Sequence, residues 1–367
     1  MAVAIEDLEV VAGRDALGEK LFQAVLGTMD IYAVYLGDRL GLYEALAAIE
    51  PATPGELAGA TGTAERYVRE WLEQQTVSGI LACDNPEAEA ADRRFVFPAG
   101  HAEALTEVDN PGYVAPFARI AVGAVDPIRE LVAAFRTGGG VPYEAYGADL
   151  REGQAGMNRN LFLRQLGTEY LPAIADLDAR LRSGSPARVA DIGCGVGWSS
   201  VGIAQAYPNV RVDGFDLDEA SVAEAQAVIV EAGVGGRVEI SLRDAADPAL
   251  VGRYELVTAF ECVHDMSDPV GALRTMRRLA GDGGTVLVMD ERVAERFDPT
   301  AGDIERLMYG FSVFHCLPVG LADTPSVGTG TVMRPATLRG YALEAGFRDV
   351  EILPLENVFF TFYRLHV

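Results

Sequence analysis

A glycine-rich loop between two aspartates is the feature of the sequence that most plainly indicates chemistry. In ADIGCGVGWSS the glycines at 193, 195 and 197 let the chain turn sharply and approach a ligand closely. Asp191 precedes these glycines, and Asp216 follows in GFDLD, where a carboxylate can accept hydrogen bonds from both hydroxyls of a ribose. The spacing GxGxG differs from the GxGxxG of a NAD site. The loop therefore predicts a binding site for a ligand that contains a ribose.

Two of the four histidines stand where an imidazole could act. His264 lies in FECVHDMSDP, at the end of a predicted strand, and His315 lies in FSVFHCLPVG, among apolar residues. A histidine at the carboxyl end of a strand suits a general base, because its pKa lies near neutral pH. Two neutral imidazoles on separate elements can instead hold a divalent metal or iron. A histidine among apolar residues can also be a core residue bonded to a backbone carbonyl, and the residues alone leave these interpretations open.

The composition restricts the classes of partner. The chain has 367 residues, 49% of them hydrophobic, so it can bury sizeable cores in more than one domain. Its net charge of −24 argues against nucleic acids and anionic membranes, whose phosphates attract clustered Lys and Arg. No apolar stretch approaches membrane-spanning length, and the four cysteines have no CxxC spacing. We therefore expect a soluble, cytoplasmic protein with free thiols.

Short apolar runs that alternate with helical segments must position the candidate residues. RVADIG, VRVDGFDLD, RVEISLRD, YELVTAFECV and GTVLVMDE predict buried strands, and VEILPLENVFFTFYRL predicts two strands joined tightly at Glu356-Asn357. Asp244 and Ala245 end the third strand, at the sheet edge where an adenine ring would lie. The pattern predicts an α/β doubly wound sheet with a hairpin at its edge.

The residues before this sheet predict a winged helix-turn-helix. Thr53-Pro54 can cap a short helix, Gly62 marks the turn into a second, and ILACDN and RRFVFPAG predict the two strands of a wing. The second helix carries two arginines and three glutamates, which makes it a poor reader of DNA. We therefore expect a dimerisation and substrate-lid domain. The predicted divisions are 1–107 for the winged-helix domain, 108–183 for a helical linker and substrate lid interrupted by the loop-rich GGGVPYEAYGADLREGQAG, and 184–367 for the sheet domain.

Over about residues 170–367 the sequence resembles the class I S-adenosylmethionine-dependent methyltransferases, whose first motif DIGCGVG matches. The resemblance implies a Rossmann-like seven-stranded methyltransferase domain behind the mostly helical winged-helix domain, with S-adenosylmethionine as cofactor. It also implies that Asp216 holds the ribose, that Leu217 packs on the adenine, and that Asp244 and Ala245 meet the edge of that ring. The implied cofactor-binding residues are Asp191, Gly193, Gly195, Gly197, Asp216, Leu217, Asp244, Ala245 and Phe260.

FECVHDMSDP is similar to the segment of small-molecule O-methyltransferases whose histidine removes a proton from a hydroxyl. The matching residue is His264. Those enzymes share the dimerising winged-helix domain, so the resemblance implies a homodimer. Met266 stands where their pattern usually has an aromatic residue, a departure that weakens the implication of an aromatic substrate.

A histidine before the CLP triplet resembles the α-keto acid C-methyltransferases of peptide-antibiotic pathways, in which two histidines bind a metal beside the cofactor. On this resemblance His264 and His315 are the ligands of a zinc or iron ion. The small-molecule substrate is then a 2-oxo acid, methylated at its β-carbon through a metal-chelated enolate. Asp265 or a metal-bound hydroxide removes the β-proton, and Asp290 and Glu291 support the site or add a third ligand.

We favour this C-methylation at the level of the sequence. The alternative is a metal-free O-methyltransferase in which His264 is the general base and His315 fills the core, because a metal-bound His264 cannot also be a free base. A winged-helix regulator that senses the cofactor without catalysis is a third possibility, and it would need the basic recognition helix that this sequence lacks.

Overall fold

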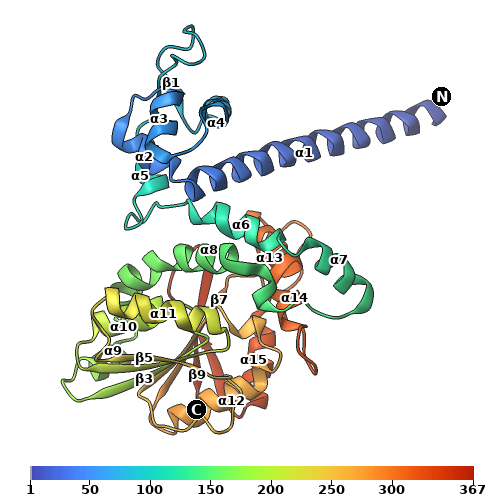
Figure 1. Cartoon of the computed structure of the whole chain (residues 1–367). Helices are drawn as coiled ribbons and strands as arrows, with labels where there is room; N and C mark the ends of the chain where they lie inside the picture. Colours follow the sequence, from blue (N-terminus) through green and yellow to red (C-terminus); the bar gives the residue numbers. More distant parts are fainter. Residues whose placement is uncertain (1) are drawn as a thin grey trace. The chain divides into compact units, whose positions relative to one another are not determined.

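The computed structural model describes residues 2–367, with side chains from residue 9 onward. Its chain forms two compact units, Met1–Val122 and Gly123–Val367. A seven-stranded sheet in the order β5-β4-β3-β6-β7-β9-β8 lies at the centre of the second unit (Figure 1). The first five strands are parallel, and β9 runs antiparallel to β7 and β8. The strands are β3 (Ala187–Ile192), β4 (Val210–Asp216), β5 (Val238–Leu242), β6 (Leu256–Phe260), β7 (Thr285–Glu291), β8 (Asp349–Ile352) and β9 (Phe360–His366).

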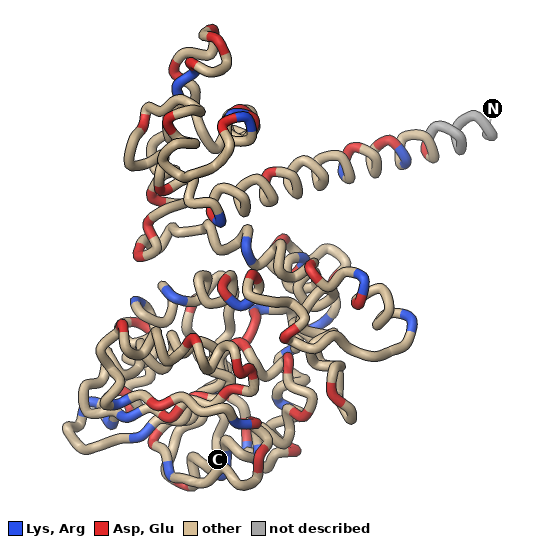
Figure 2. The backbone as a smooth tube through the Cα atoms, in the orientation of Figure 1, with Lys and Arg blue, Asp and Glu red and all other residues tan. Residues whose placement is uncertain are grey.

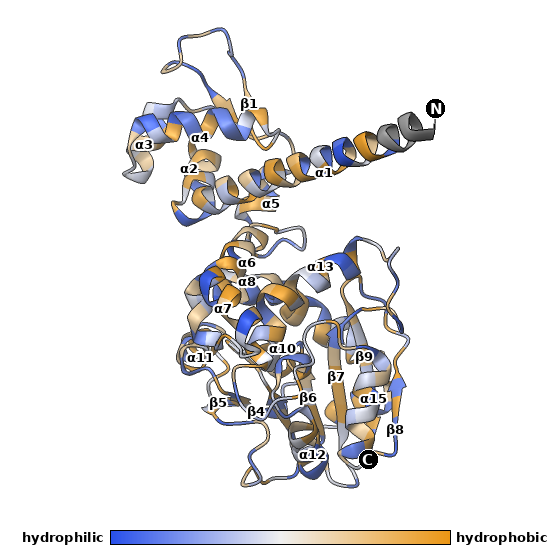
Figure 3. Ribbon diagram, turned by 90° about the vertical axis from the view of Figure 1, so that its right-hand side faces the viewer, coloured by the Kyte–Doolittle hydropathy of each residue, from blue (hydrophilic) through white to orange (hydrophobic). Residues whose placement is uncertain are grey.

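Helices cover both faces of this sheet and form two cores (Figure 3). Every residue of β6 and β7 is buried, as expected for parallel strands between two helical layers. On one face pack η2 (Leu161–Tyr170), α9 (Ala175–Leu181), α10 (Trp198–Ala206) and α11 (Glu219–Glu231). On the other pack α12 (Pro269–Ala280) and α15 (Pro335–Glu344). The predicted Rossmann-like α/β fold is confirmed.

The remaining helices of this unit lie before the sheet or in an insertion after β7. Before the sheet come α7 (Ile128–Thr137), η1 (Tyr143–Tyr146) and α8 (Gly147–Asn160). The short η3 (Val263–Asp265) follows β6 directly. The insertion consists of α13 (Asp303–Phe311), η4 (Ser312–Cys316) and α14 (Leu317–Gly320).

The first unit has the predicted winged-helix elements. Thr53 caps α3 in a reciprocal capping box with Glu56, and Gly62 ends that helix with φ 68. Each wing strand is only two residues long. The elements are α1 (Ala2–Arg39), α2 (Leu42–Ile49), α3 (Pro54–Thr61), α4 (Glu65–Val77), β1 (Ala82–Cys83), β2 (Phe95–Val96), α5 (His101–Thr106) and α6 (Pro116–Val125), which crosses the boundary between the units.

Helix α4, the recognition helix of a DNA-binding winged helix, carries paired charges. Arg66 forms an ion pair with Glu70, and Arg69 lies 3.4 Å from Glu65. Acidic and basic residues lie together on this helix (Figure 2). Because its arginines are engaged with glutamates, α4 offers little positive charge to a phosphate backbone.

Two local predictions were wrong. The segment GADLREGQAG was expected to be a loop, but it forms α8, in which Gly153 is buried, so tertiary packing outweighs the low helix propensity of glycine. Strands β8 and β9 are not joined tightly at Glu356-Asn357. Leu353 still donates to Phe362 at 2.9 Å, but Pro354 has no N–H, and the ladder gives way to a longer loop. No helix among residues 2–367 is long and apolar enough to cross a membrane.

Candidate active site

The glycine loop connects β3 to α10, and each of its three glycines has a positive φ. The values are 63° for Gly193, 52° for Gly195 and 85° for Gly197, a region that favours glycine. A Cβ on Gly193 would lie 2.7 Å from the sulfur of Cys262, and one on Gly197 would lie 2.5 Å from Ile240. No atom lies within 4 Å of a Cβ built on Gly195. The outer glycines are therefore needed for packing, and Gly195 leaves open space for a ligand.

Asp216, at the end of β4, is tied to this loop. Its Oδ2 accepts a hydrogen bond from the Gly195 N–H at 2.7 Å, and its Oδ1 accepts one from the Asp218 N–H at 2.9 Å. Burial raises the pKa of Asp216 although these donors oppose the shift. Each oxygen keeps a lone pair for a further donor. Beside it the apolar Leu217 is 65% exposed. The open space, the half-used carboxylate and the exposed leucine fit the adenosine part of S-adenosylmethionine.

Asp191 lies inside the fold, and its hydrogen bonds are made to protein groups. Its Oδ2 accepts hydrogen bonds from Ser199 at 2.6 Å and Ser200 at 2.7 Å, and its Oδ1 accepts one from Thr258 at 2.7 Å. The residue is 1% exposed. Asp191 thus ties the first turn of α10 to β6, and through that turn it fixes the glycine loop.

Three more residues were expected to contact the cofactor, and they differ from one another in burial. Asp244 is exposed after β5, and its Oδ1 accepts a hydrogen bond from the Ala246 N–H at 2.8 Å. Ala245 is partly buried against the core on the α12 side. Phe260 is buried in the other core, where its ring stacks on Phe162 with 5.6 Å between centroids. Phe260 is therefore a packing residue in this structure.

His264 is buried in η3 among carboxylates. Its Nδ1 lies 2.8 Å from Asp290 Oδ1 and 3.0 Å from Glu291 Oε2, at the end of the adjacent strand β7. Its Nε2 lies 3.2 Å from Asp265 Oδ1. Burial would lower the pKa of His264, but the three carboxylates outweigh burial and hold that pKa well above its usual range. With Asp290 as acceptor for Nδ1–H, Nε2 is the nitrogen that can exchange a proton with a bound molecule.

The carboxylates around His264 are incompletely hydrogen-bonded. Burial raises the pKa of Glu291 to about 8, and burial together with the Glu291 charge raises the pKa of Glu261 well above its usual range. Buried oxygens of Glu261 (Oε1) and Asp290 (Oδ2) have no hydrogen-bond partner. Buried polar atoms in native proteins nearly always have partners, so this cluster has the character of a ligand site.

His315 lies in η4, a π-helical turn, and such turns occur often at functional sites. Its ring packs edge-on against Tyr143 and Tyr146, with centroids 5.7 and 4.8 Å away. Its Nδ1 is 3.3 Å from the Cys316 sulfur, whereas its Nε2 has no partner. Burial lowers the pKa of His315 to about 4, so the imidazole is neutral. Burial raises the pKa of Asp265, but His264 and, to a smaller extent, His315 outweigh it and lower that pKa below its usual range.

The donor atoms for a metal form two groups that share His264. One combines His264 with Asp265 and Cys316, the other combines it with Asp290 and Glu291, and within each group the donor atoms lie within 4.8 Å of one another. His315 belongs to neither group. Imidazole, thiolate and carboxylate together suit zinc or iron, so the residues present fit such an ion, although with a different donor set from the expected His264–His315 pair.

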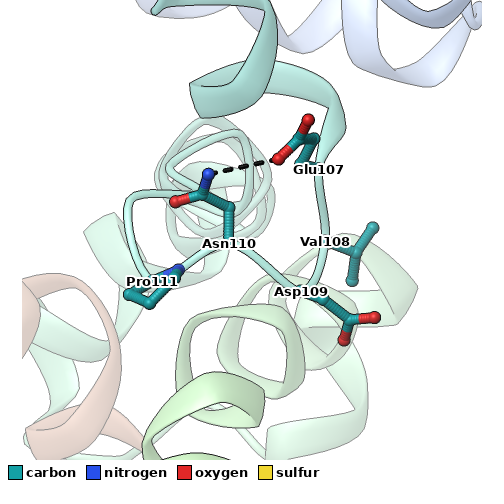
Figure 4. A pocket seen from close by; sticks show the side chains of 5 residues that line it. All are labelled: Glu107, Val108, Asp109, Asn110 and Pro111. Atoms are coloured by element: carbon teal, nitrogen blue, oxygen red, sulfur yellow. Dashed lines mark hydrogen bonds between the residues drawn. The ribbon is translucent and has the colours of Figure 1, made fainter.

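Sequence reasoning missed three residues of this cluster. Glu261 lies within FECVHDMSDP and Cys316 within FSVFHCLPVG, but only the histidines of these segments were singled out. A charged residue directly after a buried strand was an available signal for Glu261. Asn158 of α8 donates to Glu261 Oε2 at 3.1 Å, and nothing in its sequence context marks it. A shallow hollow at Glu107–Pro111 of the first unit, where Asn110 donates to Glu107, presents none of these groups (Figure 4).

Comparison with known proteins identifies two domain families in the chain. Residues 29–107 match the Rv2258c-like winged HTH domain, and residues 190–286 match a methyltransferase domain. The chain is 33% identical over 168 residues to the ubiquinone biosynthesis O-methyltransferase of Pseudomonas aeruginosa, which covers 46% of this chain and 67% of that enzyme. It is 33% identical over 103 residues to the polyketide synthase ThaQ of Burkholderia thailandensis, which covers 28% of this chain and 5% of the synthase.

Among solved structures, the chain is similar to the mitomycin 7-O-methyltransferase MmcR, with a TM-score of 0.70 and 21% identity. The superposition covers 97% of this chain and 99% of that one. At this level of identity the likeness concerns the fold, and it extends over both units of the chain.

Proposed function

Because the chain belongs to the class I S-adenosylmethionine-dependent methyltransferases with an N-terminal winged-helix domain, we propose that it methylates a hydroxyl group of a small organic molecule, with His264 as general base. The observation that carries this proposal is the 2.8 Å contact between His264 Nδ1 and Asp290 at the carboxyl edge of the sheet. The glycine loop and Asp216 lie at the same edge, because the carboxyl ends of parallel strands meet there.

The residues around the loop divide the binding of the cofactor between them. Gly195 leaves room for it, Asp216 accepts from the ribose hydroxyls, and Leu217 offers an apolar surface to the adenine. When bound, S-adenosylmethionine supplies a methyl group on a positively charged sulfur. Asp191 acts indirectly. Its hydrogen bonds to Ser199 and Ser200 hold the first turn of α10, into which the glycine loop leads.

His264, with Asp290 and Glu291, removes the proton of the acceptor hydroxyl. In the unprotonated form of His264, Asp290 accepts from Nδ1–H, which fixes the tautomer and leaves Nε2, 3.2 Å from Asp265 Oδ1, as the nitrogen that takes the proton of the acceptor hydroxyl. As the oxygen loses its proton to Nε2, Asp290 and Glu291 stabilise the imidazolium that forms. Burial of His264 keeps water from competing for the same nitrogen. General acid–base catalysis of this kind contributes about 10²- to 10⁴-fold.

A second candidate is methylation of the β-carbon of a 2-oxo acid, and the donor set around His264 favours it. His264, Asp265 and Cys316 could hold a divalent ion, and His315 has an unpartnered Nε2 nearby. Such an ion would act as a Lewis acid towards the keto and carboxylate oxygens of the substrate. In that case His264 would be a ligand, so the two candidates assign it exclusive roles.

One experiment separates the candidates. Protein purified without added metal is analysed for zinc and iron, and is then incubated with methyl-labelled S-adenosylmethionine and panels of phenols, alcohols and 2-oxo acids. A metal-free protein that forms an O–CH₃ product supports the first candidate. About one ion per chain, lost in Cys316→Ala, together with a C–CH₃ product seen by NMR, supports the second. Failure to bind S-adenosylhomocysteine would overturn both.

We also propose that the chain is a homodimer in which a second copy covers α1. Large apolar side chains along this helix are exposed, including Leu17 at 56%, Leu21 at 58% and Val25 at 52%. A run of exposed apolar side chains along a 38-residue helix is typical of a surface that a partner covers. Leu21→Glu with Val25→Glu should convert the dimer to a monomer in light scattering, and a wild-type monomer would contradict the proposal.

A further inference from the structure

His315 has one ring nitrogen that the fold leaves without a partner. The residue is 1% exposed, and its Nε2 is shielded from solvent and makes no hydrogen bond. The other nitrogen, Nδ1, lies 3.3 Å from the sulfur of Cys316. Buried polar atoms in native proteins nearly always have partners, and an unpaired one costs free energy. Nε2 therefore has the character of a binding group that a ligand completes.

The surroundings of His315 fix its ring without using Nε2. Tyr143 and Tyr146 of η1 pack edge-on against the imidazole, with centroids 5.7 and 4.8 Å away. The hydroxyl of Tyr143 donates to Gln154 Oε1 at 2.9 Å, and that of Tyr146 donates to Phe314 O at 2.9 Å. Because both hydroxyls donate to other groups, neither tyrosine supplies a proton to Nε2. The imidazole is held by packing, and its outer nitrogen stays available.

His315 lies close to the nitrogen of His264 that takes the proton of the acceptor. In the chain that follows α14, the Gly330 N–H donates to His264 O at 3.1 Å, so this part of the chain is tied to η3. Cys316 belongs with His264 and Asp265 to a group whose donor atoms lie within 4.8 Å of one another. Asp265 is the carboxylate 3.2 Å from His264 Nε2. A molecule whose hydroxyl reaches that nitrogen therefore brings its neighbouring atoms towards His315.

We infer that His315 Nε2 binds a second hydroxyl group of the acceptor, so that the preferred acceptor carries two hydroxyls close together. A hydroxyl both donates and accepts, so it satisfies Nε2 in either tautomer of the imidazole. A site that binds a hydroxyl rejects the analogue that lacks it, because the polar atom of the site then stays buried and unpaired. The inference rests on the proposed function, in which the first hydroxyl gives its proton to His264.

Three substitutions separate Nε2 from the rest of the ring. His315→Phe keeps an aromatic ring against the two tyrosines and removes both nitrogens. In His315→Gln the side-chain amide can take the place of Nε2, whereas in His315→Asn it can take only that of Nδ1. His366→Phe, at a histidine paired with Glu351 outside this site, is the matched control. Circular dichroism verifies that each variant is folded.

The probes are catechol, which has two adjacent hydroxyls, and phenol, which has one. Both are titrated by calorimetry into protein saturated with S-adenosylhomocysteine. The wild type and the control should bind catechol about tenfold or more tightly than phenol. His315→Phe and His315→Asn should remove that preference, His315→Gln should retain it, and the affinity for S-adenosylhomocysteine should not change. A role confined to packing would instead lower the affinities for catechol and phenol equally.

Three results overturn the inference. The first is a wild type that binds both probes equally or binds neither, as expected if Nε2 contacts only an ordered water. The second is a preference for catechol that survives in His315→Phe. The third is a stoichiometric metal ion that His315→Phe removes. The proposed function fails on a different readout, the absence of any O–CH₃ product from methyl-labelled S-adenosylmethionine, so the two failures are distinguishable.

Discussion

Buried carboxylates occur in two regions of the methyltransferase unit, and their hydrogen bonding differs. Beneath the glycine loop, Asp191 accepts from three hydroxyl groups of the protein. Around His264, Asp290 and Glu261 each keep a buried oxygen without a hydrogen bond. A buried polar group that is fully paired stabilises one packing arrangement, whereas an unpaired one costs free energy until a ligand pairs it. The first region therefore holds the fold, and the second has the character of a site that a ligand completes.

The largest expected effect is a loss of catalytic rate on substitution in the region around His264. His264→Ala should lower the rate of methyl transfer by about 10²- to 10⁴-fold, because the acceptor then loses its base. Affinity for S-adenosylhomocysteine should stay unchanged, since the ring of His264 is engaged with Asp265, Asp290 and Glu291. Rates are measured with the acceptor found in the labelled-methyl screen. His366→Ala, at an exposed histidine paired with Glu351, is the control. A rate within tenfold of wild type would remove His264 from the mechanism.

The next largest effect is a loss of stability on substitution of Asp191, in the region beneath the glycine loop. Asp191→Ala should lower the free energy of unfolding by about 3 kcal/mol, because Ser199, Ser200 and Thr258 lose their common acceptor. Asp191→Asn should cost less, since an amide oxygen still accepts from the serines. Urea unfolding followed by circular dichroism measures both.

The same measurement on Asp290→Asn should show little loss, because this change removes one charge from a crowded cluster. A loss as large as that of Asp191→Ala would mean that the carboxylates around His264 also hold the fold together.

Asp290→Asn should also shift the pH dependence of the rate. The reaction needs unprotonated His264, so kcat/KM rises with pH as it passes the pKa of that imidazole. Burial alone lowers this pKa, and Asp290 is the foremost charge that raises it. Without that charge the rise should occur at lower pH, by about one unit or more. An unchanged profile would show that the titrating group is not His264.

The sequence allowed the framework of the first region to be predicted, because its chemistry is local. The glycines of DIGCGVG must adopt positive φ wherever a strand turns directly into a helix, and Asp216 ends the next strand of the same sheet edge. Strands β6 and β7 are buried on both faces and have continuous apolar runs, so they were visible as well, and β4 and β5 were visible as alternating apolar residues.

The second region could be predicted only in part, because it depends on segments far apart in the chain. His264 and His315 were found by their unusual contexts, but nothing local shows that Asn158 reaches Glu261 across 103 positions. The positive φ of Glu261 has no sequence signal, since glycine or asparagine would be expected there. The tight turn at Glu356-Asn357 failed for a local reason, the missing donor of Pro354.

The smallest expected effect tests whether the hydrogen bonds to Asp191 contribute additively to the free energy of unfolding. Ser200→Ala removes one of the three hydroxyls that bind Asp191, while Ser199 still donates to the same oxygen. The free energy of unfolding should fall by about 1 kcal/mol, and the rate of methyl transfer should stay unchanged. Urea unfolding beside the labelled-methyl assay measures both. If this change instead costs as much as Asp191→Ala, the three hydroxyls and the carboxylate stabilise one another cooperatively, and the glycine loop depends on the intact set.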